Sequence, residues 1–293
     1  MPTALVTGAS GGLGRRIVGR LRANGWRVRA LVHHAAVPDA DEAVQGSLLE
    51  PDACAEAVEG CDAVLHAAAT THARSERRYR AVNVEGTRAL VEATRAAGID
   101  RFVLLSTRTA SPASGWYGES KLAAERIVSA SGLRWTILRL AEVYGAGQGE
   151  GVDDVIARAR AGRLIVLPGN GESELCPLHV DDAALACANT LDADSAVGRT
   201  LVVGGDCLTL RELAERCIAR SNSQSRTIKV PWAVLVGVSV AARVLPLPMY
   251  PDQVKRLRAA KPTARAAVLA ELSVTPRLLD DWLRATGPAR IGS

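Results

Sequence analysis

The sequence of 293 residues predicts an α/β fold of the doubly wound class, in which helices cover both faces of a parallel sheet, with a smaller, mostly helical C-terminal part. Two observations carry this prediction. Short apolar runs of strand length alternate with segments whose apolar residues recur at helical spacing. A glycine-rich turn also joins the first apolar run, residues 3–7, to the first helical segment, residues 15–22.

The glycine-rich turn predicts a dinucleotide site. Gly8 allows the sharp turn, Gly11 lets backbone approach a pyrophosphate, and Gly14 lets the helix pack close to the strand. The helix begins at this turn, and its free N–H groups attract anions. A merely structural turn is the alternative, and the position directly after a strand favours the dinucleotide. The residues expected to contact the cofactor here are Gly8, Ser10, Gly11, Gly12, Leu13 and Gly14.

The end of the second strand predicts the choice of cofactor. An acidic residue at this place would bind the ribose hydroxyls of NAD and repel the extra phosphate of NADP. The position holds Val32, followed by His33 and His34, and Arg15 and Arg16 lie across the glycine turn. NADP(H) is therefore favoured over NAD(H). The alternative, that these are ordinary surface residues, applies best to His34 and Arg16.

Later strands are expected to end in residues suited to a ligand. The run at 62–69 closes in small side chains, Ala67, Ala68 and Ala69, which leave room at the edge of the sheet. We expect His66 within it to be a hydrogen-bonded structural histidine rather than a catalytic base. The remaining expected strands are 27–32, 43–48, 101–107, 133–140 and 200–203, with a helix from 83 to 97 and others from 206 onward.

Tyr117 and Lys121 form a candidate catalytic pair. Residues four apart on a helix project from the same face, and an ammonium near a phenol favours the phenolate. Such a tyrosine can exchange a proton near neutral pH. The pattern is common by chance, so its meaning depends on the motifs around it.

Those motifs occur in order along the chain. They are the glycine turn, Asp62-x-Val64-x-His66-x-Ala68-Ala69, Asn83-Val84-x-Gly86-Thr87, Ser106-Thr107, Tyr117-x-x-x-Lys121, Val143-Tyr144-Gly145 and His179-Val180-Asp181-Asp182. Together they resemble the extended branch of the short-chain dehydrogenase/reductase superfamily, also called the NAD-dependent epimerase/dehydratase family. The resemblance covers nearly the whole chain and implies a Rossmann fold.

The resemblance also implies roles. Tyr117 would be the general acid/base, Lys121 would lower its pKa and hold the nicotinamide ribose, and Thr107, or else Ser106, would bind the substrate oxygen. Asp181 and Asp182 are expected to stabilise a helix N-terminus rather than to take part in catalysis. The further cofactor contacts would be Arg15, His33, Ser47, Leu48, Ala67, Ala68, Ala69, Asn83 and Lys121, and the substrate contacts would be Thr107, Arg108 and Glu142.

Departures from the family pattern constrain the substrate. Ser47 stands where an aspartate usually contacts the adenine. Glu142 replaces an asparagine, and Leu175 an arginine, that hold the substrate in nucleotide-sugar members. Since arginine is the usual partner of a diphosphate, a smaller or less charged substrate is expected. Arg108 and Arg258 are candidates to compensate. The apolar stretch 230–247 is core by default and a substrate lid by resemblance.

The expected function is an NAD(P)-dependent oxidoreductase acting on a carbonyl or alcohol. The alternatives are a nucleotide-sugar epimerase or dehydratase that transfers hydride transiently to bound NAD, and a non-catalytic cofactor-binding sensor. The expected Rossmann domain comprises residues 1–145 and 176–204, and the substrate-binding domain 146–175 and 205–293. A homodimer is expected by resemblance.

Composition excludes several other classes. The net charge of +5 is scattered, without a basic stripe carrying aromatics, so nucleic acid is not an expected partner. No apolar stretch is long enough to span a bilayer, and no signal segment precedes the first strand. The six cysteines show neither metal-site spacing nor a disulfide framework, so we expect no metal, reduced thiols and a cytoplasmic location.

Overall fold

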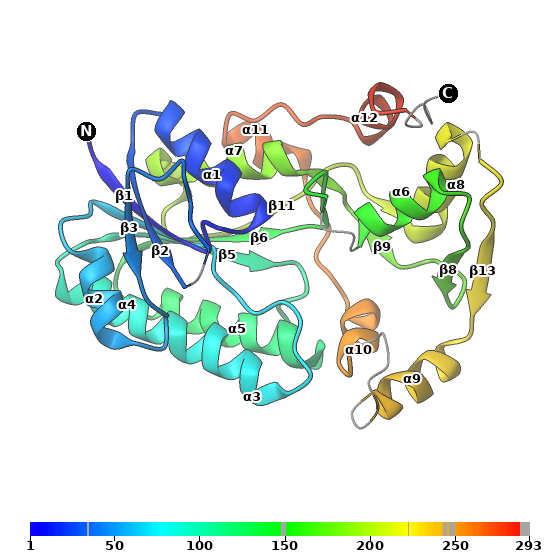
Figure 1. Ribbon diagram of the computed structural model, residues 1–293, viewed down its shortest axis with the longest axis horizontal. Helices are drawn as coiled ribbons and strands as arrows, with labels where there is room; N and C mark the ends of the chain where they lie inside the picture. Colours follow the sequence, from blue (N-terminus) through cyan, green and yellow to red (C-terminus); the bar gives the residue numbers. More distant parts are fainter. Residues whose placement is uncertain (34, 148–150, 222, 243–244, 246–249, 288–293) are drawn as a thin grey trace.

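The computed structural model describes residues 1–33, 35–147, 151–221, 223–242, 245 and 250–287, and confirms the predicted fold class (Figure 1). Its main sheet consists of β1 (Thr3–Thr7), β2 (Arg27–Val32), β3 (Glu42–Gln45), β4 (Ala63–His66), β5 (Arg101–Thr107), β6 (Arg134–Leu140) and β11 (Arg199–Val203). The strands are all parallel, in the order β11-β6-β5-β4-β1-β2-β3. The order reverses between β1 and β4, so a crevice is expected beyond their carboxyl ends.

Helices cover both faces of this sheet (Figure 1). One face carries α1 (Gly12–Ala23), α7 (Val180–Asp192) and α11 (Ala266–Glu271), and the other α2 (Pro51–Val58), α4 (Gly86–Ala96) and α5 (Gly115–Ser129). Leu21 on the first face and Leu90 on the second have no exposed surface. Burying a leucine of this kind stabilises the fold by about 2 kcal/mol.

The predicted helix from Asn83 begins earlier than expected. Asn83 lies within a π-helical turn, η1 (Arg80–Glu85), which continues from α3 (Glu76–Tyr79) into α4 without a break. The residues before Asn83 are mostly charged and exposed, so they show no apolar helical periodicity. Tyr79 is the exception, since its side chain is completely buried.

A second packing unit lies beside the sheet (Figure 1). Its apolar cluster joins residues of β7 (Val143–Tyr144), α6 (Val152–Arg160), β8 (Ile165–Pro168), β9 (Glu174–Leu175), β12 (Leu208–Thr209), α8 (Leu210–Ser221) and α12 (Leu279–Ala285). The other elements of this part of the chain are β10 (Leu178–His179), β13 (Thr227–Val230), α9 (Trp232–Ala241) and α10 (Gln253–Arg258). The 3₁₀ turn η2 (Asp194–Ala196) precedes β11. The division into two domains stays a prediction.

The expectation of a wholly helical chain after residue 206 is wrong. The strands β12 and β13 form because each finds a partner in the preceding insertion, β9 and β8 respectively. Of the apolar stretch 230–247, the structure describes α9 and residue 245 but not positions 243–244 and 246–247. No helix in the described part of the chain is long and apolar enough to cross a membrane.

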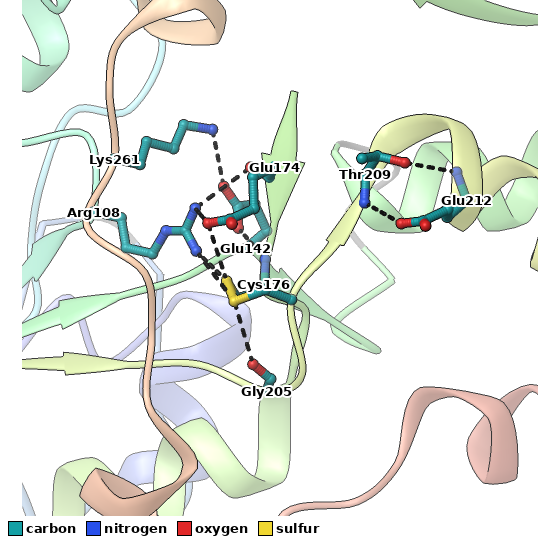
Figure 2. Close-up of a disulfide and its surroundings, with 9 residues drawn as sticks. Arg108, Glu142, Glu174, Cys176, Gly205, Thr209, Glu212 and Lys261 are labelled. Carbon is teal, nitrogen blue, oxygen red and sulfur yellow. Dashed lines mark hydrogen bonds and ion pairs between the residues drawn. A yellow bond between two sulfur atoms is a disulfide. The ribbon is translucent and has the colours of Figure 1, made fainter. Parts of the chain in front are cut away.

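The expectation that all cysteines are reduced is also wrong, because Cys176 and Cys207 form a disulfide (Figure 2). The antiparallel pairing of β12 with β9 sets Leu208 opposite Leu175, and the same register brings Cys207 opposite Cys176. Sequence spacing does not reveal this pairing, since the ladder depends on the tertiary fold. The other four cysteines are buried thiols.

We predict that the Cys176–Cys207 bridge stabilises the folded state. The bridge joins residues 31 positions apart, and closing a loop of this length lowers the entropy of the unfolded chain by the equivalent of about 3 to 4 kcal/mol. Urea unfolding with and without dithiothreitol should show a loss of that order in the wild type and no further loss in Cys207→Ser. If dithiothreitol changed the free energy of unfolding equally in the wild type and in Cys207→Ser, the bridge would not form.

Candidate active site

A cleft of about 1230 Å³ lies across the carboxyl ends of the central strands. It extends from the glycine turn after β1 to the first turns of α5 and α10. Its walls include Gly8, Ala68, Thr107, Tyr117, Glu142 and Lys261. The sheet edge therefore brings together residues from distant parts of the chain, as parallel strands require.

The glycine turn forms a surface without side chains. Gly8 has a φ of 71°, and a Cβ there would lie 2.7 Å from the backbone nitrogen of Ala68. A Cβ on Gly14 would lie 2.1 Å from the carbonyl oxygen of Gly8. The turn is closed by the Gly11 N–H, which donates to the same oxygen at 3.1 Å. This cradle at the N-terminus of α1 fits a pyrophosphate. The other predicted residues of the turn, Ser10, Gly12 and Leu13, also line the cleft.

At the end of the cleft beside β2 and β3, the lining residues are His33, Ser47 and Leu48. Arg15 is exposed beside it and donates one hydrogen bond, to the Ser10 carbonyl at 3.1 Å. Arg16 is engaged elsewhere, since it pairs with Asp181 at 3.0 Å and donates to backbone carbonyls. His34 lies outside the described residues.

The loop after β4 lines the cleft through Ala67, Ala68 and Ala69, whereas Asn83 lies behind it. The buried Asn83 side chain accepts the Thr70 N–H at 2.7 Å and donates to the Ser120 hydroxyl at 3.0 Å. Asn83 thus ties the loop to α5 and is not brought to the cleft wall.

His66 is a buried, hydrogen-bonded histidine, as expected. Its two ring nitrogens lie 2.7 Å from the Thr7 hydroxyl and 2.9 Å from the Thr87 hydroxyl. Burial, with the nearby Lys121 charge, lowers the pKa of His66 to about 3. The ring is therefore neutral and holds β1, β4 and α4 together.

Thr107 and Tyr117 meet at the end of β5. The Thr107 hydroxyl is near enough to the Tyr117 phenol to lower the pKa of that tyrosine, and it lies 3.1 Å from the hydroxyl of Thr109. Desolvation raises the pKa of Tyr117, while the charge of Arg256 and the Thr107 hydrogen bond oppose that rise. Ser106, the alternative to Thr107 for binding the substrate oxygen, donates instead to the buried carboxylate of Glu125 at 2.5 Å.

Lys121 lies one turn beyond Tyr117 and lines the same cleft. Its ammonium donates to the Leu105 carbonyl of β5 at 2.6 Å. Burial lowers the pKa of Lys121 to about 8, although the charge of Glu125 opposes this shift.

Glu142 is a half-buried carboxylate with partners on both oxygens (Figure 2). It accepts the Cys176 N–H at 3.0 Å and pairs with Lys261 at 3.1 Å. Burial alone would raise the pKa of Glu142, but the charges of Lys261 and Arg108 and the Cys176 hydrogen bond hold it below its ordinary value. The carboxylate is thus ionised and neutralised by the protein.

Arg108 is not among the residues that line the cleft, since its side chain is buried beside the disulfide (Figure 2). Its guanidinium donates to the Cys176 sulfur and to the Glu174 carbonyl. Among the described residues, one group of metal-type ligands exists, Glu174, Cys176 and Cys207, and its two sulfurs are joined to each other. Leu175 does line the cleft, whereas Arg258 does not.

The predicted helix-stabilising aspartates do lie in the first turn of α7. Asp181 pairs with Arg16 and Arg277, and Asp182 pairs with Arg277 at 3.1 Å. These bonds hold α7 to α1 and to the chain before α12.

Sequence reasoning missed four residues at the Tyr117 end of the cleft, namely Tyr250, Asp252, Arg256 and Lys261. The first helical turn of α5 is tied to the chain before α10, because the Tyr117 N–H donates to the Asp252 carboxylate at 3.2 Å. Arg256 lies over the Tyr117 ring, 4.2 Å from its centroid. No motif marks these residues, which approach the site only through the fold.

Comparison with known proteins agrees with this geometry. Residues 4–204 match the model of the NAD dependent epimerase/dehydratase family. The chain is 30% identical to 2-alkyl-3-oxoalkanoate reductase of Stenotrophomonas maltophilia, over 93% of its own length and 89% of the relative's. It is 37% identical to the ceramide reductase of Caulobacter vibrioides, over 61% of its own length and 57% of the relative's.

The fold is also that of a solved epimerase structure. The UDP-glucose 4-epimerase of Thermotoga maritima, determined with UDP-glucose, superposes with a TM-score of 0.76 at 20% identity, covering 97% of each chain. The glycine cradle, the strand order and the family match together leave one assignment. This chain belongs to the NAD dependent epimerase/dehydratase family of extended short-chain dehydrogenases/reductases.

Proposed function

We propose that the protein is an oxidoreductase that interconverts a carbonyl and an alcohol, with Tyr117, Thr107 and Lys121 as its catalytic set. The observation that carries the proposal is that Thr107, Tyr117 and Lys121 line the cleft that also contains the glycine cradle. The Thr107 hydroxyl is near enough to the Tyr117 phenol to lower the pKa of that tyrosine. These two hydroxyls can bind one substrate oxygen together.

In the reducing direction, Thr107 positions the carbonyl oxygen by a hydrogen bond, and Tyr117 donates a proton to that oxygen as charge develops on it. Lys121 would hold the ribose hydroxyls of a bound nicotinamide cofactor. The nicotinamide, when bound, supplies the hydride. In the oxidising direction Tyr117 removes the hydroxyl proton. Holding the reactants in this geometry supplies much of the rate.

The substrate side favours a less charged molecule than a nucleotide sugar. The Glu142 carboxylate and the Lys261 ammonium neutralise each other, and Leu175 places an apolar wall where a diphosphate-binding arginine would be needed. Arg108 contacts the Cys176 sulfur and the Glu174 carboxylate, so it does not replace the missing diphosphate-binding arginine. The ethyl ester of a 2-alkyl-3-oxoalkanoate is a suitable assay probe, because one relative is named for reducing that acid class.

We predict that Tyr117→Phe lowers the turnover of this ester by about 100-fold or more, since general acid catalysis is worth that much. Thr107→Val should lower it as well, through loss of the substrate hydrogen bond. The measurement is the steady fall of nicotinamide absorbance with each protein. Arg20→Gln, a change on the far end of α1, serves as the matched control.

Undiminished turnover in Tyr117→Phe would contradict the proposed mechanism. A redox-neutral epimerase or dehydratase gives product from a UDP-sugar without steady loss of nicotinamide absorbance, and this result would establish the alternative. A cofactor-binding sensor would bind NADPH without turning over any of the probes.

We infer a preference for NADP(H). No carboxylate follows β2 to repel the phosphate, and the exposed guanidinium of Arg15 lies beside the glycine turn with one N–H engaged. Charge-assisted contacts of this kind are the usual source of phosphate affinity.

We predict that Arg15→Gln weakens NADPH binding about tenfold, equivalent to about 1.4 kcal/mol. NADH binding should stay unchanged, because it lacks the phosphate that the arginine would hold. Fluorescence titration of both cofactors measures the effect, with Arg20→Gln on the same helix as control. Tighter binding of NADH than NADPH by the wild type would overturn the preference.

The expected homodimer would form through α4 and α5, which cover one face of the sheet. The cytoplasmic location loses the support it drew from reduced cysteines, since Cys176 and Cys207 are joined.

A further inference from the structure

The short helix α10 packs on the first turn of α5. The Asp252 carboxylate accepts the Tyr117 N–H at 3.2 Å and the Tyr79 hydroxyl at 3.4 Å. Asp252 is nearly completely buried. At Gly115, whose φ is 85°, a Cβ would lie 3.0 Å from the Asp252 carbonyl oxygen. The position of α10 relative to Tyr117 is therefore closely determined.

Arg256, four residues after Asp252, lies over the face of the Tyr117 ring. The guanidinium carbon is 4.2 Å from the ring centroid, within the range of a cation–π contact. A hydrogen bond from the guanidinium to the Thr71 carbonyl at 2.9 Å fixes its direction. The arginine thus lies between the loop after β4 and the tyrosine.

Lys121 is placed differently. Its ammonium is directed at the Leu105 carbonyl of β5, and its pKa is lowered to about 8 by burial. The charge that opposes the raised pKa of Tyr117 is that of Arg256, acting together with the Thr107 hydrogen bond. Arginine also stays protonated at every working pH.

We propose that Arg256 is a positioning residue for Tyr117, and that its charge over the ring favours the phenolate in addition to the lysine of the Tyr-x-x-x-Lys pattern. The proposal rests on the proposed function of Tyr117 as acid/base.

The groups that face Tyr117 come from several elements. Thr107 belongs to β5, Lys121 to α5 and Tyr79 to α3. Asp252 directly precedes α10, and Arg256 lies within α10. Burial raises the pKa of Tyr79 to about 12, and the hydrogen bond with the Ala73 backbone opposes this rise only in part, so this neighbour stays neutral.

The sign of the expected effect follows from the charge. A cation over the ring stabilises the phenolate, so its removal disfavours that form and raises the pKa of Tyr117. In alcohol oxidation, which needs the phenolate as base, the rising limb of the pH profile should move to higher pH.

We predict that Arg256→Gln and Arg256→Met each raise the pKa of Tyr117 by about one unit, the lower end of the effect of a close opposite charge. Arg256→Lys should restore most of the shift, because it keeps the charge. The readout is NMR titration of the full chain with ¹³Cζ-labelled tyrosine and bound NADP⁺, the signal being assigned by its absence in Tyr117→Phe. Two uncharged variants are used so that the loss of one to misfolding leaves the test intact.

Arg258→Gln is the matched control, because it removes the same charge from the same helix while its guanidinium lies near Trp232. An unchanged Tyr117 titration in both uncharged variants would overturn the proposal, as would equal shifts in Arg256→Lys and Arg256→Gln. These outcomes do not depend on turnover. Retained activity in Tyr117→Phe would instead refute the proposed function, so the two failures are distinguishable.

Discussion

The close approach of Gly14 to the Gly8 carbonyl is the constraint on which the site depends. A Cβ on Gly14 would lie 2.1 Å from this oxygen, so only a glycine lets α1 pack this closely against the end of β1. Ala68 after β4 also approaches Gly8, since a Cβ on Gly8 would lie 2.7 Å from the Ala68 backbone nitrogen. Because three backbone segments meet without side chains, a phosphate-sized surface remains at the edge where all the parallel strands end. Tyr117 follows β5, the neighbour of β4, and so lies beside the same surface.

The sequence predicted the parts of the site that depend on local pattern. Strand ends, the glycine turn and the helical pair Tyr117 and Lys121 are encoded within a few residues of one another, so periodicity and turn chemistry suffice to find them. The hydroxyl of Ser106 was left as an alternative to Thr107, and its bond to the buried Glu125 explains why Thr107 is the better placed.

Contacts that depend on distant returns of the chain were not predictable. The Cys176–Cys207 bridge requires the register of β9 with β12, and each of these strands is too short to be recognised from its sequence pattern. The sequence identifies Glu142 as an unusual carboxylate for the family. It does not show that this carboxylate pairs with Lys261, which lies 119 positions further along the chain. The departure from the family pattern at Glu142 therefore identified a residue of the cleft, but it did not predict that Lys261 balances the charge of this carboxylate.

The location of α10 couples two opposing effects on Tyr117. Covering the ring removes water and disfavours the phenolate, so a better enclosed tyrosine is a weaker base. The same burial lowers the pKa of Lys121, which weakens the lysine as a compensating charge. A guanidinium keeps its charge under these conditions. Because Asp252 and Arg256 come with the same segment, the element that encloses Tyr117 also brings the cation that offsets the enclosure.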